Sequence, residues 1–470
     1  MMFTFEKLWN LLKDKKLRKV DLKAHVGITS ATLAKLGKNE AVSLDVLNRI
    51  CVYLECDIGD IMEHVYTPYR DNDTLGTFLP NKKELVHNWF GYLEGYSKNL
   101  VESELERLDG VKAILDPFGG SGTTPLVSIL NGMDSYYSET NPAMAFVIKG
   151  KTDVAFKIAT DSSLIEELDI NIKKFKQFFS ELNYKGKEVL EDFGGFEKYF
   201  EHENLFYIQK YQKFIEEIKT DEIKYIFQLA LVSVAVSISK MIRRGDLRYA
   251  KGKEILKTNN PFILEMTSKL TIMFHDIVEL DVKNIGKANF LCSDARMIQE
   301  EDLVDAIITS PPYLNGTNYI RNTKLELKLL GIVKTEKDLA LLHKKGIVAG
   351  INNVSKGSGN FDPIEEVSEI IKQLEFVSYD KRIPQMISGY FNDMNKIFEV
   401  SSKVLKNNGY FIMDIGDSQF AGVHVPTHEI LAMIADRHGF KVYENEVIRK
   451  RKSKSGFELT QRILRFKLKK

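Results

Sequence analysis

The chain has 470 residues, of which 44% are hydrophobic and 28% are charged, and its 66 Lys and Arg nearly balance its 65 Asp and Glu, for a formal net charge of +1. This composition excludes a chain that is disordered throughout, because there is ample apolar surface to offset the loss of conformational entropy. The length predicts about two to four domains. The overall charge does not by itself indicate a nucleic-acid-binding protein, although a neutral sum can hide an uneven distribution.

Cysteine content and apolar segments favour a cytoplasmic location. Three cysteines are too few for a disulfide framework and indicate a reducing compartment. The first residues have no cationic head followed by an apolar core, so no signal peptide is predicted. The longest apolar run, from Phe227 to Ser239, falls short of the roughly 20 residues needed to cross a bilayer, and we expect a buried helix there.

Residues 1–65 are predicted to form a compact domain of five short helices, the last from Ile58 to Val65. Short polar residues mark the expected helix starts, and a glycine in the left-handed conformation marks one expected helix end. These signals are Gly27, Thr29 or Ser30, Ser43 and Asp57. Residues 66–78, with Pro, Gly and several Asp and Asn, are predicted to be a linker.

The segment from Asp21 to Asn39 has the pattern of a DNA-reading helix pair. The exposed face of its second helix would carry Thr29, Ser30, Thr32 and Lys35. Short polar residues at the start of such a helix can reach phosphates and base edges. A small helical bundle for protein contact fits the pattern equally well. Residues 1–65 nevertheless resemble the lambda-repressor or Cro-like helix-turn-helix family, and this resemblance implies sequence-specific DNA binding.

From about residue 79, short strands alternate with helices, which predicts an α/β doubly wound sheet. The predicted strands are Val111–Leu115, Ser135–Ser138, Asn289–Cys292, Asp305–Thr309 and Gly409–Ile415. A long helical insert, 155–280, separates the second strand from the third, and a mixed segment, 314–400, follows the fourth. The alternation in the last residues, LTQRILRFKLKK, predicts an edge strand whose lysines block further pairing.

The sequence DPFGGSGTT, residues 116–124, lies between the first of these strands and a helix. A glycine-rich turn in this position lets a ligand approach the backbone at the carboxyl end of the strand and at the helix N-terminus. It is neither a phosphate-binding P-loop nor GxGxxG.

Acidic residues end the next two strands. Glu139 lies some twenty residues beyond the glycine-rich turn, where a carboxylate can accept hydrogen bonds from ribose hydroxyls. Asp294, after the third strand, could accept a hydrogen bond from an adenine amino group, although Asp also commonly caps helices.

The fourth strand ends in Ser310, Pro311, Pro312 and Tyr313. The two prolines stiffen the backbone and stop the strand ladder. A pocket of this kind suits a flipped-out base, with Tyr313 stacking on it and with Ser310 Oγ and the Pro311 carbonyl accepting from its exocyclic amine.

Together these motifs resemble those of the S-adenosylmethionine-dependent DNA amino-methyltransferases, over residues 79–470. The resemblance implies a Rossmann-like methyltransferase sheet, S-adenosylmethionine as cofactor and double-stranded DNA as substrate. The cofactor residues it implies are Asp116, Phe118, Gly119, Gly120, Gly122, Thr123, Thr124, Glu139, Asp294 and Trp89. Trp89 belongs to the segment HNWFGYLEGYS, residues 87–97, which resembles the element that closes over the methionine in such enzymes.

The serine form of the catalytic motif is typical of cytosine-N4 methylation, and adenine-N6 methylation stays open. The sequence does not favour carbon-5 methylation of cytosine, because that reaction needs a cysteine nucleophile, conventionally after a proline, and none of the three cysteines follows one. No metal site is predicted: His424 and His428 are interrupted by Pro426, and we expect a solvated loop there.

Three further interpretations remain open at this point. The protein could act chiefly as a transcriptional regulator through residues 1–65, or it could methylate RNA. It could also belong to a restriction-modification system and protect DNA from a cognate restriction endonuclease. The oligomeric state is not determined by the sequence, although helix-turn-helix proteins often dimerise.

Two basic clusters offer DNA contacts. Residues 448–470 contain ten Lys or Arg and one acid, a local charge of +9, and residues 240–257 contain seven Lys or Arg and two acids. Phosphate contact is a natural use of such clusters beside a base-flipping site. We favour Arg243, Arg244 and Arg248 as DNA contacts over the basic residues from Arg449 to Lys454, because Gly245 suggests an ordered turn.

Overall fold

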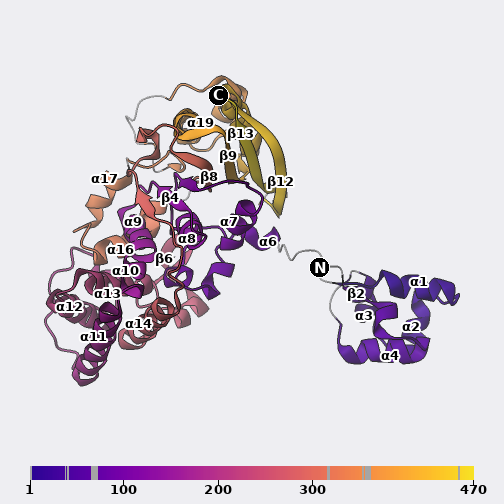
Figure 1. Cartoon of the computed structure of the whole chain (residues 1–470), viewed down its shortest axis with the longest axis horizontal. Coiled ribbons are helices and arrows are strands. Elements are labelled where there is room, and N and C mark those ends of the chain that lie inside the picture. Colours follow the sequence, from indigo (N-terminus) through magenta and orange to yellow (C-terminus); the bar gives the residue numbers. More distant parts are fainter. Residues whose placement is uncertain are drawn as a thin grey trace. The chain divides into compact units, whose positions relative to one another are not determined.

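The computed structural model describes residues 3–37, 39, 42–64, 72–314, 318–343, 345–351, 354, 361–453 and 456–470. The chain folds as two compact units, Met1–Asp71 and Asn72–Lys470, and each is described by itself (Figure 1). Of the predicted linker, residues 66–71 lie outside the described residues. Residues 72–78 instead pack as part of the second unit, where α6 (Asn72–Leu75) begins and Phe78 is buried.

The first unit is all-helical apart from one short strand pair. Its elements are β1 (Phe3–Thr4), α1 (Glu6–Asp14), α2 (Lys19–Val26), α3 (Ser30–Gly37), α4 (Leu44–Leu54), α5 (Ile58–Ile61) and β2 (Glu63–His64). Gly27 adopts a φ of +70° after α2, as predicted. The Thr29 hydroxyl accepts a hydrogen bond from the Thr32 amide and so caps α3.

Two further predicted caps are confirmed, but the fifth helix is shorter than predicted. The Ser43 hydroxyl accepts from the Val46 amide, and the Asp57 carboxylate accepts from the Ile58 amide. The prediction of a helix from Ile58 to Val65 is wrong over the described residues, because α5 ends at Ile61. The chain is extended at Glu63 because this residue pairs with Thr4 of β1.

A seven-stranded sheet forms the centre of the second unit, in the order β12-β13-β9-β8-β3-β4-β7. Its strands are β3 (Ala113–Asp116), β4 (Asp134–Tyr137), β7 (Ala288–Phe290), β8 (Val304–Thr309), β9 (Leu405–Gly416), β12 (Phe440–Lys452) and β13 (Glu458–Leu468). The five predicted strands are confirmed, with shifts at their ends, and all pair in parallel. The last two strands pair antiparallel.

The edge-strand prediction for the C-terminus is wrong. β13 is an interior strand, hydrogen-bonded to β9 on one side and to β12 on the other. The alternating pattern correctly predicts a strand, but its lysines do not mark an edge, because β12 pairs with β13 on that side. The edge is β12, which carries the basic run from Arg449 to Lys452.

Helices cover both faces of the sheet. One face packs against α7 (Lys98–Leu105) and α8 (Thr123–Leu130), with Ile114, Ile308 and Ile412 as sheet residues of that core. The other face packs against α18 (Ser368–Val377), α19 (Arg382–Val404) and α20 (Thr427–Arg437). Helices on both faces of a mainly parallel sheet define the predicted α/β class.

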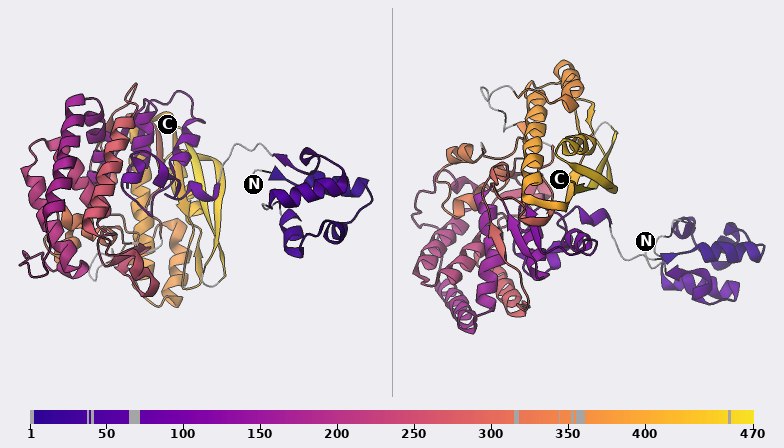
Figure 2. Two further views of the ribbon diagram at one scale, coloured as in Figure 1. Left: turned by 90° about the horizontal axis from the view of Figure 1, so that it is seen from below. Right: turned by 45° about the horizontal axis from the view of Figure 1, so that its top comes forward.

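The predicted insert between β4 and β7 is largely helical. It contains α10 (Ala155–Ala159), α11 (Ser162–Glu181), α12 (His202–Glu217), α13 (Asp221–Val234) and α14 (Phe262–Glu279). It also contains a hairpin that the sequence analysis did not foresee, β5 (Met241–Arg244) with β6 (Asp246–Tyr249). Figure 2 shows the insert at one end of the second unit and β12 and β13 at the other.

The apolar run from Phe227 to Ser239 is a buried helix, as predicted, only as far as Val234, where α13 ends. Over the described residues, every helix is too short or too polar to span a membrane.

Candidate active site

A cavity of about 420 Å³ lies in the second unit, beside the carboxyl ends of β3, β4 and β8. This is the edge at which open α/β sheets bind their ligands, and the volume is that of a small-molecule site. Many segments that are distant in sequence contribute its walls. Among the lining residues are Tyr92, Glu94, Tyr96, Phe118, Gly119, Gly120, Thr123, Glu139, Ser310, Pro311, Pro312, Tyr313, Tyr319, Gly416, Arg449, Arg451 and Gln461.

The glycine-rich turn lies against one wall of the cavity. Gly120 and Gly122 have φ values of +53° and +85°, in the left-handed region that favours glycine. A Cβ on Gly119 would lie 2.8 Å from the Ile148 side chain, so a larger residue would push the turn away from its support. Four of the predicted cofactor residues, Phe118, Gly119, Gly120 and Thr123, line the cavity.

Asp116, Gly122 and Thr124 lie behind the turn, outside the cavity wall. The Asp116 carboxylate accepts hydrogen bonds from the Tyr96 hydroxyl at 2.9 Å and from the Thr309 hydroxyl at 2.6 Å. Burial raises the pKa of Asp116 to about 6, although these bonds oppose the rise. Hydrogen bonds of Asp116 therefore link the glycine-rich turn to Thr309, the residue that precedes Ser310.

A buried lysine donates a hydrogen bond to the glycine-rich turn. Lys151 Nζ donates to the carbonyls of Ser121 at 3.2 Å and of His87 at 3.3 Å, and burial lowers its pKa to about 7. The sequence carried no signal for this residue, because a lysine in a helical segment is ordinarily solvated.

Glu139 projects from the loop after β4 into the cavity. One carboxylate oxygen accepts from the Gly120 amide and the other from the Asn141 amide, each at 2.7 Å. Burial raises the pKa of Glu139 to about 7, against the effect of these backbone hydrogen bonds. Each oxygen retains a lone pair that can accept from a ligand.

The segment from Ser310 to Tyr313 lines the opposite wall, and Gln461 of β13 anchors its aromatic ring. Gln461 Nε2 donates to the Tyr313 hydroxyl at 2.8 Å and lies 2.9 Å from the Asp414 carboxylate of β9. A Cβ on Gly416 would lie 3.5 Å from the ring, so the ring rests on this glycine. Burial raises the pKa of Asp414 to about 6.

Gln461, Asp414 and Tyr96 are site residues that sequence analysis missed. Gln461 follows Tyr313 by 148 positions and belongs to no recognisable motif. Only the pairing of β13 beside β9 brings its amide to the ring.

Two more predicted cofactor residues, Trp89 and Asp294, are also absent from the cavity wall. Trp89 is fully buried, and its indole N–H donates to Asp276 of α14. The cavity is lined instead by the later part of the same predicted element, residues 92–96. Asp294 caps a short turn through the Arg296 amide and also forms an ion pair with the Arg296 guanidinium.

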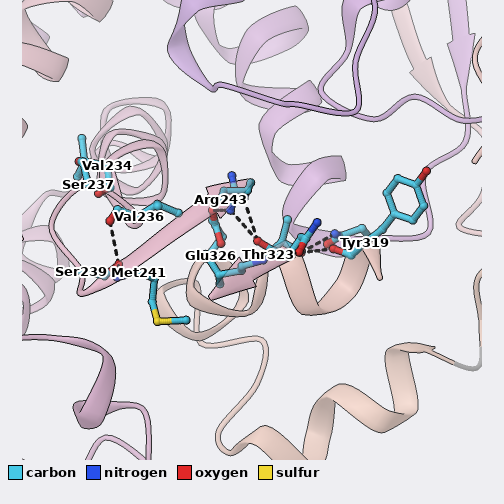
Figure 3. Close-up of polar contacts among 12 residues, drawn as sticks. Val234, Val236, Ser237, Ser239, Met241, Arg243, Tyr319, Thr323 and Glu326 are labelled. Carbon is cyan, nitrogen blue, oxygen red and sulfur yellow. Dashed lines mark hydrogen bonds and ion pairs between the residues drawn. The ribbon is translucent and has the colours of Figure 1, made fainter. Parts of the chain in front are cut away.

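The arginines of the β5–β6 hairpin are engaged in internal pairs. Arg243 pairs with Glu326 (Figure 3) and donates to the Asn322 carbonyl, and its side chain is only 11% exposed. Arg248 forms two hydrogen bonds to Glu254, at 2.8 and 3.0 Å. Arg244 is more open, with 61% of its side chain exposed. The pairing of Arg243 weighs against its predicted phosphate contact.

The expectation of a solvated loop at His424 and His428 is wrong for His428. This residue is buried on α20, and its Nδ1 lies 2.6 Å from the Asp417 carboxylate. Pro426 does not make a loop here because it precedes the first turn of the helix, where proline is tolerated.

In the first unit, three of the predicted DNA-reading residues, Thr29, Ser30 and Thr32, lie at the start of α3, whereas Lys35 lies in its last turn. Thr29, Ser30 and Lys35 are exposed, and Thr32 is half-buried. The Thr29 and Thr32 hydroxyls lie 2.9 Å apart, which orders the N-terminal turn of the helix.

Comparisons with known proteins find relatives for both units. Residues 7–66 match the family described as the Cro/C1-type HTH DNA-binding domain. The type II methyltransferase M.BsoBI of Geobacillus stearothermophilus is 26% identical over 444 residues, covering 83% of this chain and 85% of that protein. The type II methyltransferase M.MvaI of Kocuria varians is 22% identical over 390 residues, covering 78% and 85%.

A shorter relative covers the first unit. The uncharacterized HTH-type transcriptional regulator YozG of Bacillus subtilis is 40% identical over 76 residues, covering 16% of this chain and 83% of that protein. The chain is thus a homologue of the type II methyltransferases over most of its length. Its N-terminal unit belongs to the Cro/C1-type helix-turn-helix family.

Proposed function

We propose that the protein is a DNA methyltransferase that transfers a methyl group from S-adenosylmethionine to the exocyclic amine of a flipped base in duplex DNA, preferably cytosine N4. One observation carries the proposal: the glycine-rich turn, the Glu139 carboxylate and the segment from Ser310 to Tyr313 line the same cavity. The likeness to type II methyltransferases supports it independently.

The cavity residues fit S-adenosylmethionine. A carboxylate at the end of the second strand suits the ribose hydroxyls, and Glu139 is buried there with a lone pair left on each oxygen. Phe118, Gly119 and Gly120 offer an aromatic face and accessible backbone in the same wall. When bound, S-adenosylmethionine supplies an electrophilic methyl group on its sulfonium centre.

The opposite wall would hold and orient the base. Ser310 Oγ and the Pro311 carbonyl accept the two amine protons, and this leaves nitrogen lone-pair density available for attack on the methyl carbon. Tyr313 stacks on the base, with its hydroxyl fixed by Gln461. The two prolines keep both acceptors in place without reorganisation during the reaction.

The target base is decided by nucleoside mass spectrometry of DNA treated with the full-length protein and S-adenosylmethionine. We expect N4-methylcytosine. N6-methyladenine would overturn the cytosine assignment, whereas no methylated base in DNA, with methylation of structured RNA under the same conditions, would favour the RNA alternative. Sequencing for modified bases in the same DNA identifies the target site.

Replacing Gln461 by leucine is expected to lower kcat about tenfold and leave the affinity for S-adenosylmethionine within twofold of wild type. The change removes the amide donor that the Tyr313 hydroxyl and the buried Asp414 carboxylate share. Steady-state methylation and titration calorimetry measure the two effects. Gln373→Leu, at an exposed position of α18, is the matched control, and equal losses in both variants would contradict an anchoring role.

We propose that the N-terminal unit binds DNA for regulation, in addition to the methylation activity. The exposed start of α3 and the likeness of this unit to an HTH-type regulator support this assignment. A solely regulatory protein is the second candidate, and an active methyltransferase excludes it.

The double variant Thr32→Ala/Lys35→Ala, in the full-length chain, is expected to weaken operator binding at least tenfold because it removes a base-reading hydroxyl and a phosphate contact. The methylation rate and site should be unchanged. Mobility-shift assays on the promoter DNA of its own gene measure the first, and modified-base sequencing measures the second. A changed methylation site would instead assign target recognition to this unit.

We further propose that the protein belongs to a restriction-modification system and that a cognate endonuclease is its partner in function. The proposal rests on the relatives, which are named as type II methyltransferases. DNA methylated by the protein is then expected to resist an endonuclease that cleaves the same site when the site is unmethylated.

A further inference from the structure

The proposed methylation of duplex DNA requires cations that hold the phosphates beside the extruded base, and two of the three favoured hairpin arginines are engaged in internal pairs. Arg243 pairs with Glu326, and Arg248 with Glu254. A high density of basic residues in the sequence therefore does not by itself identify the side chains that contact phosphate. The cavity wall contains two other arginines, Arg449 and Arg451, both on the edge strand β12.

Arg449 lies one strand away from the residue that anchors Tyr313. Its register partner on β13 is Gln461, whose own partner on β9 is Gly416. Directly paired residues point to the same face of a sheet, so Arg449, Gln461 and Gly416 form a row across three strands. Gly416 supports the Tyr313 ring and Gln461 holds its hydroxyl, which leaves Arg449 at the outer end of the row.

Strand alternation divides the basic run of β12 into two pairs. Arg449 and Arg451 line the cavity, whereas Lys450 and Lys452 are not among its lining residues over the described part of the chain. Lys450 forms an ion pair with Glu458 at 2.8 Å. The two faces of one strand thus carry equal charge but differ in access to the site.

Both cavity-facing arginines are exposed and have donors available. Within the described residues, the Arg449 guanidinium makes no hydrogen bond or ion pair, and the contact of Arg451 is a neutral one, to the Asp417 carbonyl at 3.2 Å. No carboxylate of the described residues neutralises either charge. A planar guanidinium with free donors matches a phosphodiester in charge and in geometry.

We propose that Arg449 and Arg451 bind backbone phosphates of the target strand on either side of the flipped nucleotide. This inference rests on the proposed function. Neighbouring strands are about 4.8 Å apart, so Arg449 stands about 10 Å from the strand that supports Tyr313, within the reach of a base and its sugar. The contact positions the strand and is independent of base identity.

The test compares Arg449→Ala and Arg451→Ala with Lys450→Ala and Lys452→Ala, all in the full-length protein. The probe is a fluorescent duplex that carries the site located by modified-base sequencing, and fluorescence anisotropy gives its Kd at several salt concentrations. Each arginine variant is expected to raise Kd about tenfold and to lower the slope of log Kd against log salt by about one, because one phosphate contact is lost. The lysine variants should stay within twofold of wild type.

Equal losses in arginine and lysine variants would overturn the proposal, because they would show a general effect of positive charge. A loss of S-adenosylmethionine affinity in calorimetry, with duplex binding unchanged, would also overturn it and assign the arginines to the cofactor carboxylate. Wild-type methylation of the same duplex is measured first. If it is absent, the proposed function fails, whereas if it is present and the arginine variants bind normally, only this inference fails.

Discussion

Replacing Ser310 by alanine is expected to reduce kcat by a factor on the order of 100, with the affinity for S-adenosylmethionine within threefold of wild type. Ser310 Oγ is the proposed acceptor for one amine proton, and its hydrogen bond strengthens as the nitrogen becomes positively charged in the transition state. The Pro311 carbonyl and the cofactor-binding wall stay intact, because they belong to the backbone and to other segments. The loss therefore falls on the chemical step.

Single-turnover transfer of a radiolabelled methyl group to duplex DNA measures the rate, and titration calorimetry measures cofactor binding. Ser180→Ala, at an exposed position of α11, is the control and should be fully active. A Ser310→Ala variant that methylates DNA at the wild-type rate would exclude Ser310 from the reaction.

Replacing Glu139 by glutamine is expected to weaken binding of S-adenosylmethionine about tenfold to a hundredfold at pH 8. The ionised carboxylate accepts from two ribose hydroxyls more strongly than an amide does, and charge-assisted hydrogen bonds are about twice as strong as neutral ones. Glu166→Gln, at an exposed position of α11, should bind normally. Calorimetry of both variants provides the comparison.

The same carboxylate predicts a pH dependence of cofactor binding. Its pKa is raised by burial to about 7, so the form that accepts both hydroxyls prevails only above that pH. We expect wild-type affinity to fall by up to tenfold per pH unit below 7, and the affinity of Glu139→Gln to be flat across the same range. An equally steep pH dependence in the variant would contradict the assignment.

Stability without cofactor should change in the opposite direction. A carboxylate with a raised folded-state pKa binds its proton more tightly in the native state, so stability falls as pH rises from about 4.5 to about 7 and is then constant. Burial raises the Glu139 pKa from its ordinary value of 4.5 to about 7, which corresponds to a loss of about 3 kcal/mol of stability at pH 8. Glu139→Gln is therefore expected to melt at a higher temperature than wild type at pH 8 and at a similar temperature at pH 4.

The motifs that line the cavity could be predicted because each is contiguous and ends a strand. Phe118, Glu139 and Ser310 follow three parallel strands, and the carboxyl ends of parallel strands meet at one edge of the sheet. Trp89 could not be assigned in this way, because its segment precedes the sheet and approaches the cavity through residues 92–96.

The basic clusters illustrate a different limit. Composition gives the charge of a segment but not its partners, and Glu326 lies 83 positions from the arginine that it neutralises. Arg465, counted in the basic C-terminus, is likewise buried against Glu104, 361 positions away. A charge that is paired inside the protein cannot serve a phosphate, and the pairing depends on contacts across the whole fold.

The sequence by itself determined the helix-turn-helix unit, the segments that form the five parallel strands and the residues at their ends, because caps, alternation and glycine-rich turns act over a few neighbouring positions. Only the tertiary structure decided which polar side chains meet. The pairing of β13 with β9 brings Gln461 to Tyr313, and the alternation of β12 beside them turns Arg449 toward the site and Lys450 away from it. Strand pairing between distant segments is set by packing of the whole sheet, and no local pattern encodes it.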